Sequence, residues 1–183
     1  MKSQIVFSIF LFFSSICIAE SLNYTLISEF EVAAPADDVW ALISSKDAHK
    51  TFQMLLPGMF EKLEILEGDG GVGTVLLVVF PPGTVPLSNE GKYVTIDNRR
   101  RVREILQVKG GYLDMGVTYF METFEIIPKG CNCVFKSMIR YEVPDELAPD
   151  VSSIISVEGI LIMAKAAAKY VVDNSKKTPK YSY

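Results

Sequence analysis

The sequence predicts an α+β fold in which a curved antiparallel sheet grips a long C-terminal helix. Three observations indicate it. Apolar runs of strand length follow one another between residues 60 and 143, and their connections contain Gly, Pro, Asn or Asp, as hairpin turns do. Two short stretches with helical spacing precede this series. Beyond residue 149, apolar residues recur at helical spacing without a further proline until residue 172. A bent sheet around such a helix often encloses a cavity for a small apolar ligand.

Each element follows from its local pattern. Residues 28–32 alternate polar and apolar side chains, as a half-buried strand does. Helical spacing with acids in the first turn predicts a helix over 37–43, and a second covers 47–55 before Pro57-Gly58. One long amphipathic helix is predicted over 149–172. The remaining strands, which complete a seven-stranded sheet, are predicted over 60–67, 74–80, 91–97, 101–109, 115–128 and 133–143.

The N-terminus predicts a secretory signal peptide over residues 1–19. A basic start precedes an uncharged apolar run, and Cys17 and Ala19 are small residues at the −3 and −1 positions of a cleavage site. The run is short for a membrane span, although an uncleaved anchor is the alternative. Residues 20–183 then form one ligand-binding domain without a membrane span, in the endoplasmic reticulum, the vacuole or outside the cell. On this route the sequon at Asn23 is usable for glycosylation.

Several kinds of site are disfavoured. The net charge of −4 offers no footprint for nucleic acid, and the basic run 99–101 fits a solvated turn. The segment Gly68–Thr74 lacks the Lys of a phosphate loop and predicts a tight hairpin. Cys131 and Cys133 are too few for a zinc site, so we expect free thiols near the surface. His49 is the only histidine, which excludes a multi-histidine metal site, and we interpret it as a surface or helix-packing residue. No metal and no cofactor are expected.

Two ionisable residues lie on strands whose inner face is ambiguous. If the face of Phe120 and Phe124 points inward, Glu122 is a carboxylate among aromatic rings, and desolvation raises its pKa. Both faces of that strand are mixed, so a solvated Glu122 fits the pattern equally well. For Arg103, simple alternation favours the outer face, because the apolar residues of its strand gather mainly on the other face.

Four stretches of the sequence resemble the corresponding stretches of a known family. They are Leu55–Glu64, the glycine hairpin through Thr74, Val94–Asn98 and the run Gly110–Thr123 (GGYLDMGVTYFMET). On these residues the chain resembles plant norcoclaurine synthases, within the pathogenesis-related class 10 family of Bet v I-like helix-grip proteins. The resemblance implies a seven-stranded sheet, a ligand tunnel and a cofactor-independent Pictet–Spengler condensation of dopamine with 4-hydroxyphenylacetaldehyde in alkaloid biosynthesis.

The resemblance also implies a site, in altered form. The family's catalytic lysine falls on Arg103, which keeps the charge but cannot release a proton near neutral pH. The catalytic aspartate falls on Glu122. The family's glutamate and tyrosine fall on Gly91 and Asn89, and a bulge near them could turn Glu90 inward as a substitute base. The implied substrate-binding residues are Leu56, Phe60, Val78, Asn89, Gly91, Tyr93, Tyr112 and Phe120.

Two functions follow from this altered site. One is a synthase with weak or altered activity that binds a small aromatic amine and an aldehyde, with Arg103 and Glu122 as catalytic residues. The alternative is a non-catalytic carrier or receptor for a small aromatic or hormone-like ligand in plant defence or signalling. In either case we expect a monomer or a weak dimer.

Overall fold

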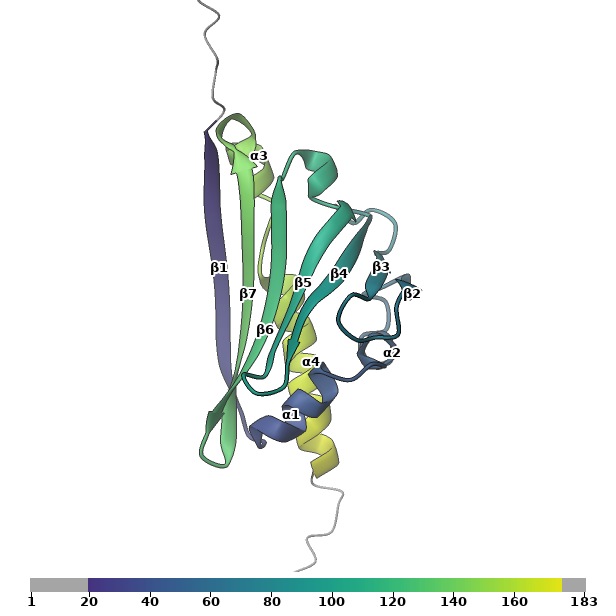
Figure 1. The fold of residues 1–183 in the computed structure, drawn as a ribbon, viewed down its shortest axis with the longest axis vertical. Coiled ribbons are helices and arrows are strands. Elements are labelled where there is room, and N and C mark those ends of the chain that lie inside the picture. Colours follow the sequence, from purple (N-terminus) through teal and green to yellow (C-terminus); the bar gives the residue numbers. More distant parts are fainter. Residues whose placement is uncertain (1–19, 176–183) are drawn as a thin grey trace, which may run out of the picture.

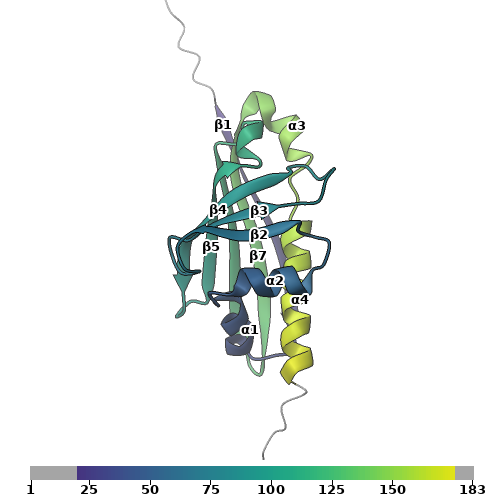
Figure 2. The same cartoon turned by 90° about the vertical axis from the view of Figure 1, so that its right-hand side faces the viewer.

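The computed structural model describes residues 20–175, so the predicted signal peptide over 1–19 lies outside the described residues. One antiparallel sheet in the order β1-β7-β6-β5-β4-β3-β2 bends around the C-terminal helix α4 (Figures 1 and 2). The predicted fold class is confirmed. The elements are β1 (Ser21–Val32), α1 (Ala36–Ile43), α2 (Ala48–Leu55), β2 (Lys62–Glu67), β3 (Val75–Val79), β4 (Ser88–Asp97), β5 (Val102–Gly110), β6 (Tyr119–Lys129), β7 (Asn132–Pro144), α3 (Ala148–Ser152) and α4 (Glu158–Ser175).

The sheet is strongly bent, which creates its concave inner face. In Figure 2, β2 and β3 cross the direction of β7, and α2 lies below them beside α4. The helix α4 turns its small residues, among them Ala164 and Ala167, into the core, where they are fully buried. The wall of β7 opposite contributes Phe135 and Ile139, both buried. Within the described residues, no helix is long and apolar enough to cross a bilayer.

The prediction of one long helix over 149–172 is wrong, because the chain forms α3 and α4 with a break between them. Two serines end one helix and begin the next. The hydroxyl of Ser153 donates to the carbonyl of Asp150 at 2.7 Å, and the hydroxyl of Ser156 accepts from the amide of Glu158 at 3.4 Å. Such local hydrogen bonds compete with the helical ladder. Ile155, in the break, is buried in the core.

Two further expectations need correction. The strand predicted over 115–128 begins only at Tyr119, because residues 113–115 form a 3₁₀ turn that ends at Gly116 in the left-handed region. Cys133 is fully buried on β7 rather than near the surface, whereas Cys131 is exposed. Both are free thiols.

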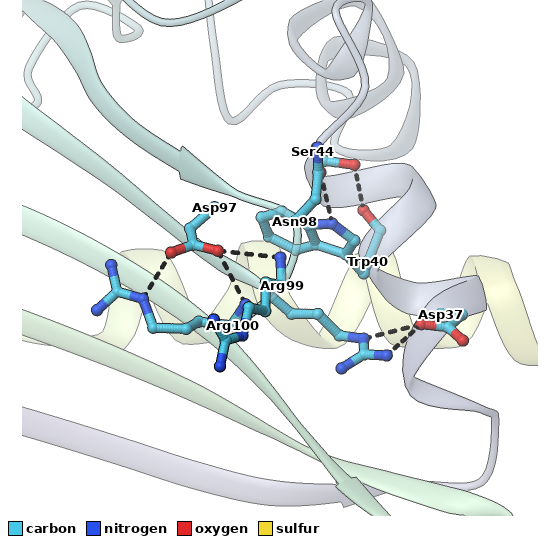
Figure 3. Close-up of polar contacts among 8 residues, drawn as sticks. Asp37, Trp40, Ser44, Asp97, Asn98, Arg99 and Arg100 are labelled. Atoms are coloured by element: carbon cyan, nitrogen blue, oxygen red, sulfur yellow. Dashed lines mark hydrogen bonds and ion pairs between the residues drawn. The ribbon is translucent and has the colours of Figure 1, made fainter.

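The basic run 99–101 is the turn between β4 and β5, as the sequence predicts. Figure 3 shows Asp97 closing this turn, since its carboxylate accepts from the backbone amides of Arg99 and Arg100, each at 2.9 Å. The side chain of Arg100 also pairs with Asp97 and is mostly exposed. Arg99 and Arg100 are therefore held by local contacts at one end of the sheet.

The same turn fixes helix α1 against the sheet. The indole Nε1 of Trp40 donates to Oδ1 of Asn98 at 3.0 Å (Figure 3). Arg101 pairs with Asp37 in the first turn of α1. The ring of Trp40 is buried. Since α1 is held here, its C-terminal carbonyls reach the inner wall of the sheet.

Candidate functional site

A cavity of about 540 Å³ lies between the inner face of the sheet, α2 and the start of α4. This volume is within the range of small-molecule sites, about 300–1,000 Å³. The structure brings all but one of the predicted site residues to its wall. Those that line it are Phe60, Val78, Asn89, Gly91, Tyr93, Arg103, Tyr112, Phe120 and Glu122. Leu56 does not line it, because its side chain packs, partly buried, against the core at the end of α2.

Arg103 lies inside, so the strand alternation is misleading and the resemblance is right about its placement. The side chain is only 3% exposed. Its Nη1 donates to the carbonyl of Ile43 at 2.5 Å, one of the unpaired carbonyls at the end of α1. The guanidinium also lies over the ring of Tyr93, 3.9 Å from the ring centre, which is a cation–π contact. Nε has no hydrogen-bond partner. Burial lowers the pKa of Arg103 from its ordinary value.

Glu122 lies on the inner face of β6 between two buried aromatic residues, Phe120 and Phe124. The surface that its side chain retains faces the cavity. Desolvation raises the pKa of Glu122 to about 7. Within residues 20–175 it forms no ion pair, even with Arg103 on the same wall. A carboxyl group in this state exchanges a proton near neutral pH, as an acid or base must.

At Gly91 the carboxylate of the family pattern is missing and its space is filled. A Cβ built on Gly91 would lie 2.8 Å from Cγ2 of Ile105, which pairs with Tyr93 in the β4–β5 register. Real Cβ atoms essentially never approach so closely, so Ile105 would have to move. A glutamate at this position would therefore require the wall around Ile105 to repack.

Glu90 does not replace that base, and the hypothesis of a substitute carboxylate there is wrong. The β4–β5 ladder is indeed irregular after Glu90, as a bulge requires, but the additional residue is Val108 on β5. The carboxylate of Glu90 accepts from Nζ of Lys109 at 2.8 Å. Glu90 is absent from the cavity wall.

His49 is a cavity residue that sequence reasoning missed. It lines the cavity from α2 while remaining partly exposed, so its interpretation as a surface or helix-packing residue omits its place on the cavity wall. Burial lowers the pKa of His49, and the charges of Lys50 and Arg103 lower it further. The imidazole is therefore neutral near pH 7 and can accept a proton. Its spacing from buried Phe52, three residues along the helix, is the signal that could have placed it on the inner face.

One other predicted site residue lies apart from the cavity. Asn23 is exposed on the edge strand β1, and its glycosylation stays a prediction. Within the part of the chain that the structure describes, no three His, Cys, Asp or Glu side chains gather in a way that could hold a metal ion.

The fold and the cavity together define a Bet v I-like helix-grip protein with a largely apolar cavity of small-molecule size. No protein-family profile matches the chain. The chain is 43% identical to S-norcoclaurine synthase 2 of Papaver somniferum over 79% of its own length and 63% of that protein. It is 35% identical to S-norcoclaurine synthase 2 of Coptis japonica over 97% of its own length and 99% of that protein.

Solved structures agree with these relatives. Norcoclaurine synthase from Thalictrum flavum in complex with dopamine and hydroxybenzaldehyde superposes with a TM-score of 0.82 at 38% identity, over 94% of this chain and 98% of that one. The allergen Ara h 8.0201, at 20% identity and a TM-score of 0.62, shares the fold alone. The chain belongs to the S-norcoclaurine synthase family.

Proposed function

We propose that this protein catalyses a stereoselective Pictet–Spengler condensation of dopamine, or a similar aromatic amine, with 4-hydroxyphenylacetaldehyde or a related aldehyde, at a reduced or altered rate. The observation that carries the proposal is Glu122, a carboxyl group with a pKa of about 7 on the wall of an aromatic cavity that also holds a buried cation. The complex of the Thalictrum flavum relative with dopamine and hydroxybenzaldehyde supports the class of ligand.

The reaction divides into steps that these groups can serve. The carboxylate of Glu122 binds the ammonium group and takes a proton, so that the free amine attacks the aldehyde carbon. Glu122 then returns that proton to the carbinolamine oxygen, so that water leaves and an iminium ion forms. The electron-rich ring then attacks the iminium carbon, and a base removes the proton from the attacked ring carbon. Arg103 stays protonated throughout and acts by stabilising negative charge on oxygen.

His49 is the candidate for the final base. It is neutral near pH 7, lines the same cavity and does not share a strand with Glu122. Gly91, at the position of the family's base, has no acidic or basic side chain. A second proton acceptor on the helix side of the cavity leaves Glu122 free for the earlier steps.

The secretory route belongs to the same proposal. The signal-like segment 1–19 would direct the chain into the endoplasmic reticulum, and the exposed side chain of Asn23 would accept a glycan there. The vacuole and the extracellular space are the destinations that this route leaves open.

The test is turnover of dopamine with 4-hydroxyphenylacetaldehyde by the 20–183 protein, followed by chiral chromatography beside Arg103→Ala and Glu122→Gln. The uncatalysed reaction gives racemic product, so an enantiomeric excess that either substitution abolishes establishes the enzyme. Racemic product at the background rate contradicts it.

The filled space at Gly91 favours a second function, the non-catalytic carrier of a small aromatic ligand. The apolar side chain of Ile105 occupies the space that a catalytic side chain at position 91 would need. Saturable binding of aromatic amines without enantiomeric excess would support this function.

A further inference from the structure

Gln107 is a buried polar residue for which the proposed mechanism has no use. It lies on the inner face of β5, two residues beyond Ile105, and it lines the cavity. Only 7% of its surface is exposed. A polar side chain in such a place is expected to have all its hydrogen bonds made, because a buried donor or acceptor without a partner is destabilising.

The carbonyl end of this amide is satisfied, and this fixes its orientation. Oε1 accepts from the backbone amides of Tyr112 at 3.0 Å and Leu113 at 3.3 Å. The opposite flip would set the NH₂ group against two N–H donors, which is impossible as hydrogen bonding. The Nε2 group therefore lies on the other side of the amide, beside Gly111.

The donor end of the amide is left without a partner. Within residues 20–175, Nε2 of Gln107 makes no hydrogen bond, yet it is not among the fully inaccessible polar atoms. A Cβ on Gly111 would lie 2.5 Å from Nε2 and 2.9 Å from Cβ of Asn89. The bare glycine, with φ of +60°, thus lets the Gln107 amide and Asn89 approach the same point of the wall.

The separation between this donor and Glu122 fits a ligand in which an aromatic ring carries two polar substituents. Glu122 pairs with Ile105 in the β5–β6 register, so Gln107 is its diagonal neighbour at about 7–8 Å. The rings of Tyr112 and Phe120, with centres 4.8 Å apart, belong to the same part of the cavity wall. An aromatic ring packed on this pair can direct one substituent toward Glu122 and another toward Gln107.

We infer that Gln107, flanked by Asn89, forms a hydrogen-bonding subsite for an acceptor oxygen on the ligand's aromatic ring, at the end remote from its amine. The inference rests on the proposed function only in placing the amine at Glu122. It makes Gln107 a specificity-determining residue that selects oxygenated over plain aromatic amines.

The experiment compares two amines that differ only in that oxygen. 2-(4-Methoxyphenyl)ethylamine and 2-(4-ethylphenyl)ethylamine have the same shape, but only the first offers an acceptor. We expect the protein to bind the methoxy amine about three- to tenfold more tightly in calorimetric titrations, the ratio for one hydrogen bond. The measured quantity is the ratio of the two dissociation constants, which a purely structural role for Gln107 would not affect.

Two variants separate recognition from folding. Gln107→Glu, measured at about pH 8.5 where carboxylates are ionised, keeps an acceptor for both backbone amides but removes the donor. Gln107→Met removes the donor with no titrating group in its place. Both are expected to bring the ratio to about one, or below it for the glutamate, while Gln107→Glu keeps the melting temperature close to that of the parent.

Equal binding of the two amines by the parent protein, or an unchanged ratio in both variants, would overturn the subsite. If enantiomeric excess persists in that case, the proposed function stands without it. A preserved preference without turnover would support the subsite and contradict the enzyme. Failure of either amine to bind would overturn both.

Discussion

Glu122 and Arg103 are opposite charges on one wall that do not pair, and this arrangement gives each a different task. The guanidinium is held by a helix carbonyl and an aromatic ring, Ile43 and Tyr93, so its charge is fixed in place. The carboxyl group has no cation to keep it ionised, and burial alone raises its pKa. One group thus supplies a constant field and the other a proton that can be exchanged.

The raised pKa of Glu122 predicts a pH-dependent stability. Its pKa is about 7 in the folded chain and near the ordinary 4.5 when unfolded, so the folded state binds the proton more tightly between these values. The contribution of Glu122 to stability is therefore most favourable below about pH 4.5, falls as pH rises through this window and stays reduced above 7. Glu122→Gln removes the titrating group. We expect it to stabilise the protein by about 3 kcal/mol near pH 8 relative to its effect near pH 4. Urea unfolding at both pH values measures this, and a pH-independent difference would contradict it.

The space at Gly91 predicts which substitution restores a base. Gly91→Glu alone is expected to cost about 1–3 kcal/mol of stability, because its Cβ meets Cγ2 of Ile105 at 2.8 Å. In Gly91→Glu/Ile105→Ala the contact is absent. Turnover should then rise at least about tenfold over Ile105→Ala alone, since a positioned base contributes about 10²–10⁴. If Gly91→Glu is as stable as the parent protein, the space at position 91 does not limit which side chain it can hold.

The sequence places these residues only in part. Alternation predicts the outer face for Arg103 because it counts apolar neighbours, whereas a helix carbonyl and an aromatic ring hold the side chain inside. The resemblance supplies its inner placement and that of Glu122. Neither alternation nor the resemblance reveals that His49 lines the cavity or that the space beside Gly91 is filled. Both features depend on which distant residues pack there.

At the scale of elements, the β4–β5 turn and α1 act together. Trp40 Nε1 and Asn98 Oδ1 join across the interface, and the buried indole has its hydrogen bond only while the turn keeps its shape. The end of α1 then offers its carbonyl to Arg103. The position of the buried charge of Arg103 therefore depends on a contact made on the outside of the cavity.

This dependence predicts different costs for two substitutions at the same interface. Asn98→Ala leaves the Trp40 N–H without its acceptor and is expected to destabilise the protein by about 1–2 kcal/mol. Asp37→Asn removes an ion pair whose acid is 79% exposed, and should cost less than about 0.5 kcal/mol. Chemical denaturation of both variants measures the order, and equal costs would contradict the assignment of Trp40–Asn98 as the principal contact.

Element boundaries were predictable where one pattern dominated. The hairpins follow from glycine-rich turns, and most strands begin or end within a few residues of their predicted limits. The break between α3 and α4 was not visible in the apolar spacing, because Ile154 and Ile155 fit a helix as well as a packed turn. The serine hydroxyls of residues 153 and 156 decide between the two through hydrogen bonds with backbone groups.

At the scale of the molecule, the cavity is built from segments far apart in the sequence. The sheet supplies the fixed cation and the exchangeable proton, and α2 closes the space with His49 facing the same volume. The fold could be predicted because its hairpins are local. The site could not be predicted in the same way, because it forms only when α2 and α4 pack over the sheet, and no local sequence pattern encodes this packing.

This closure predicts the effect of losing His49. His49→Ala should lower the rate constant for turnover about 10²-fold or more, while the binding of aromatic amines stays within about twofold of the parent, because the imidazole acts on a proton rather than on the ligand's affinity. Added imidazole should restore part of the rate in His49→Ala but none in Glu122→Gln, since a small base can refill the vacated space beside α2. A ring-deuterated amine sharpens the test, because removal of the aryl proton becomes slower in the variant and should then show a primary isotope effect. An unchanged rate in His49→Ala, or a loss of rate that imidazole does not rescue and that shows no isotope effect, would assign His49 to packing and leave Glu122 as the sole proton carrier of the cavity.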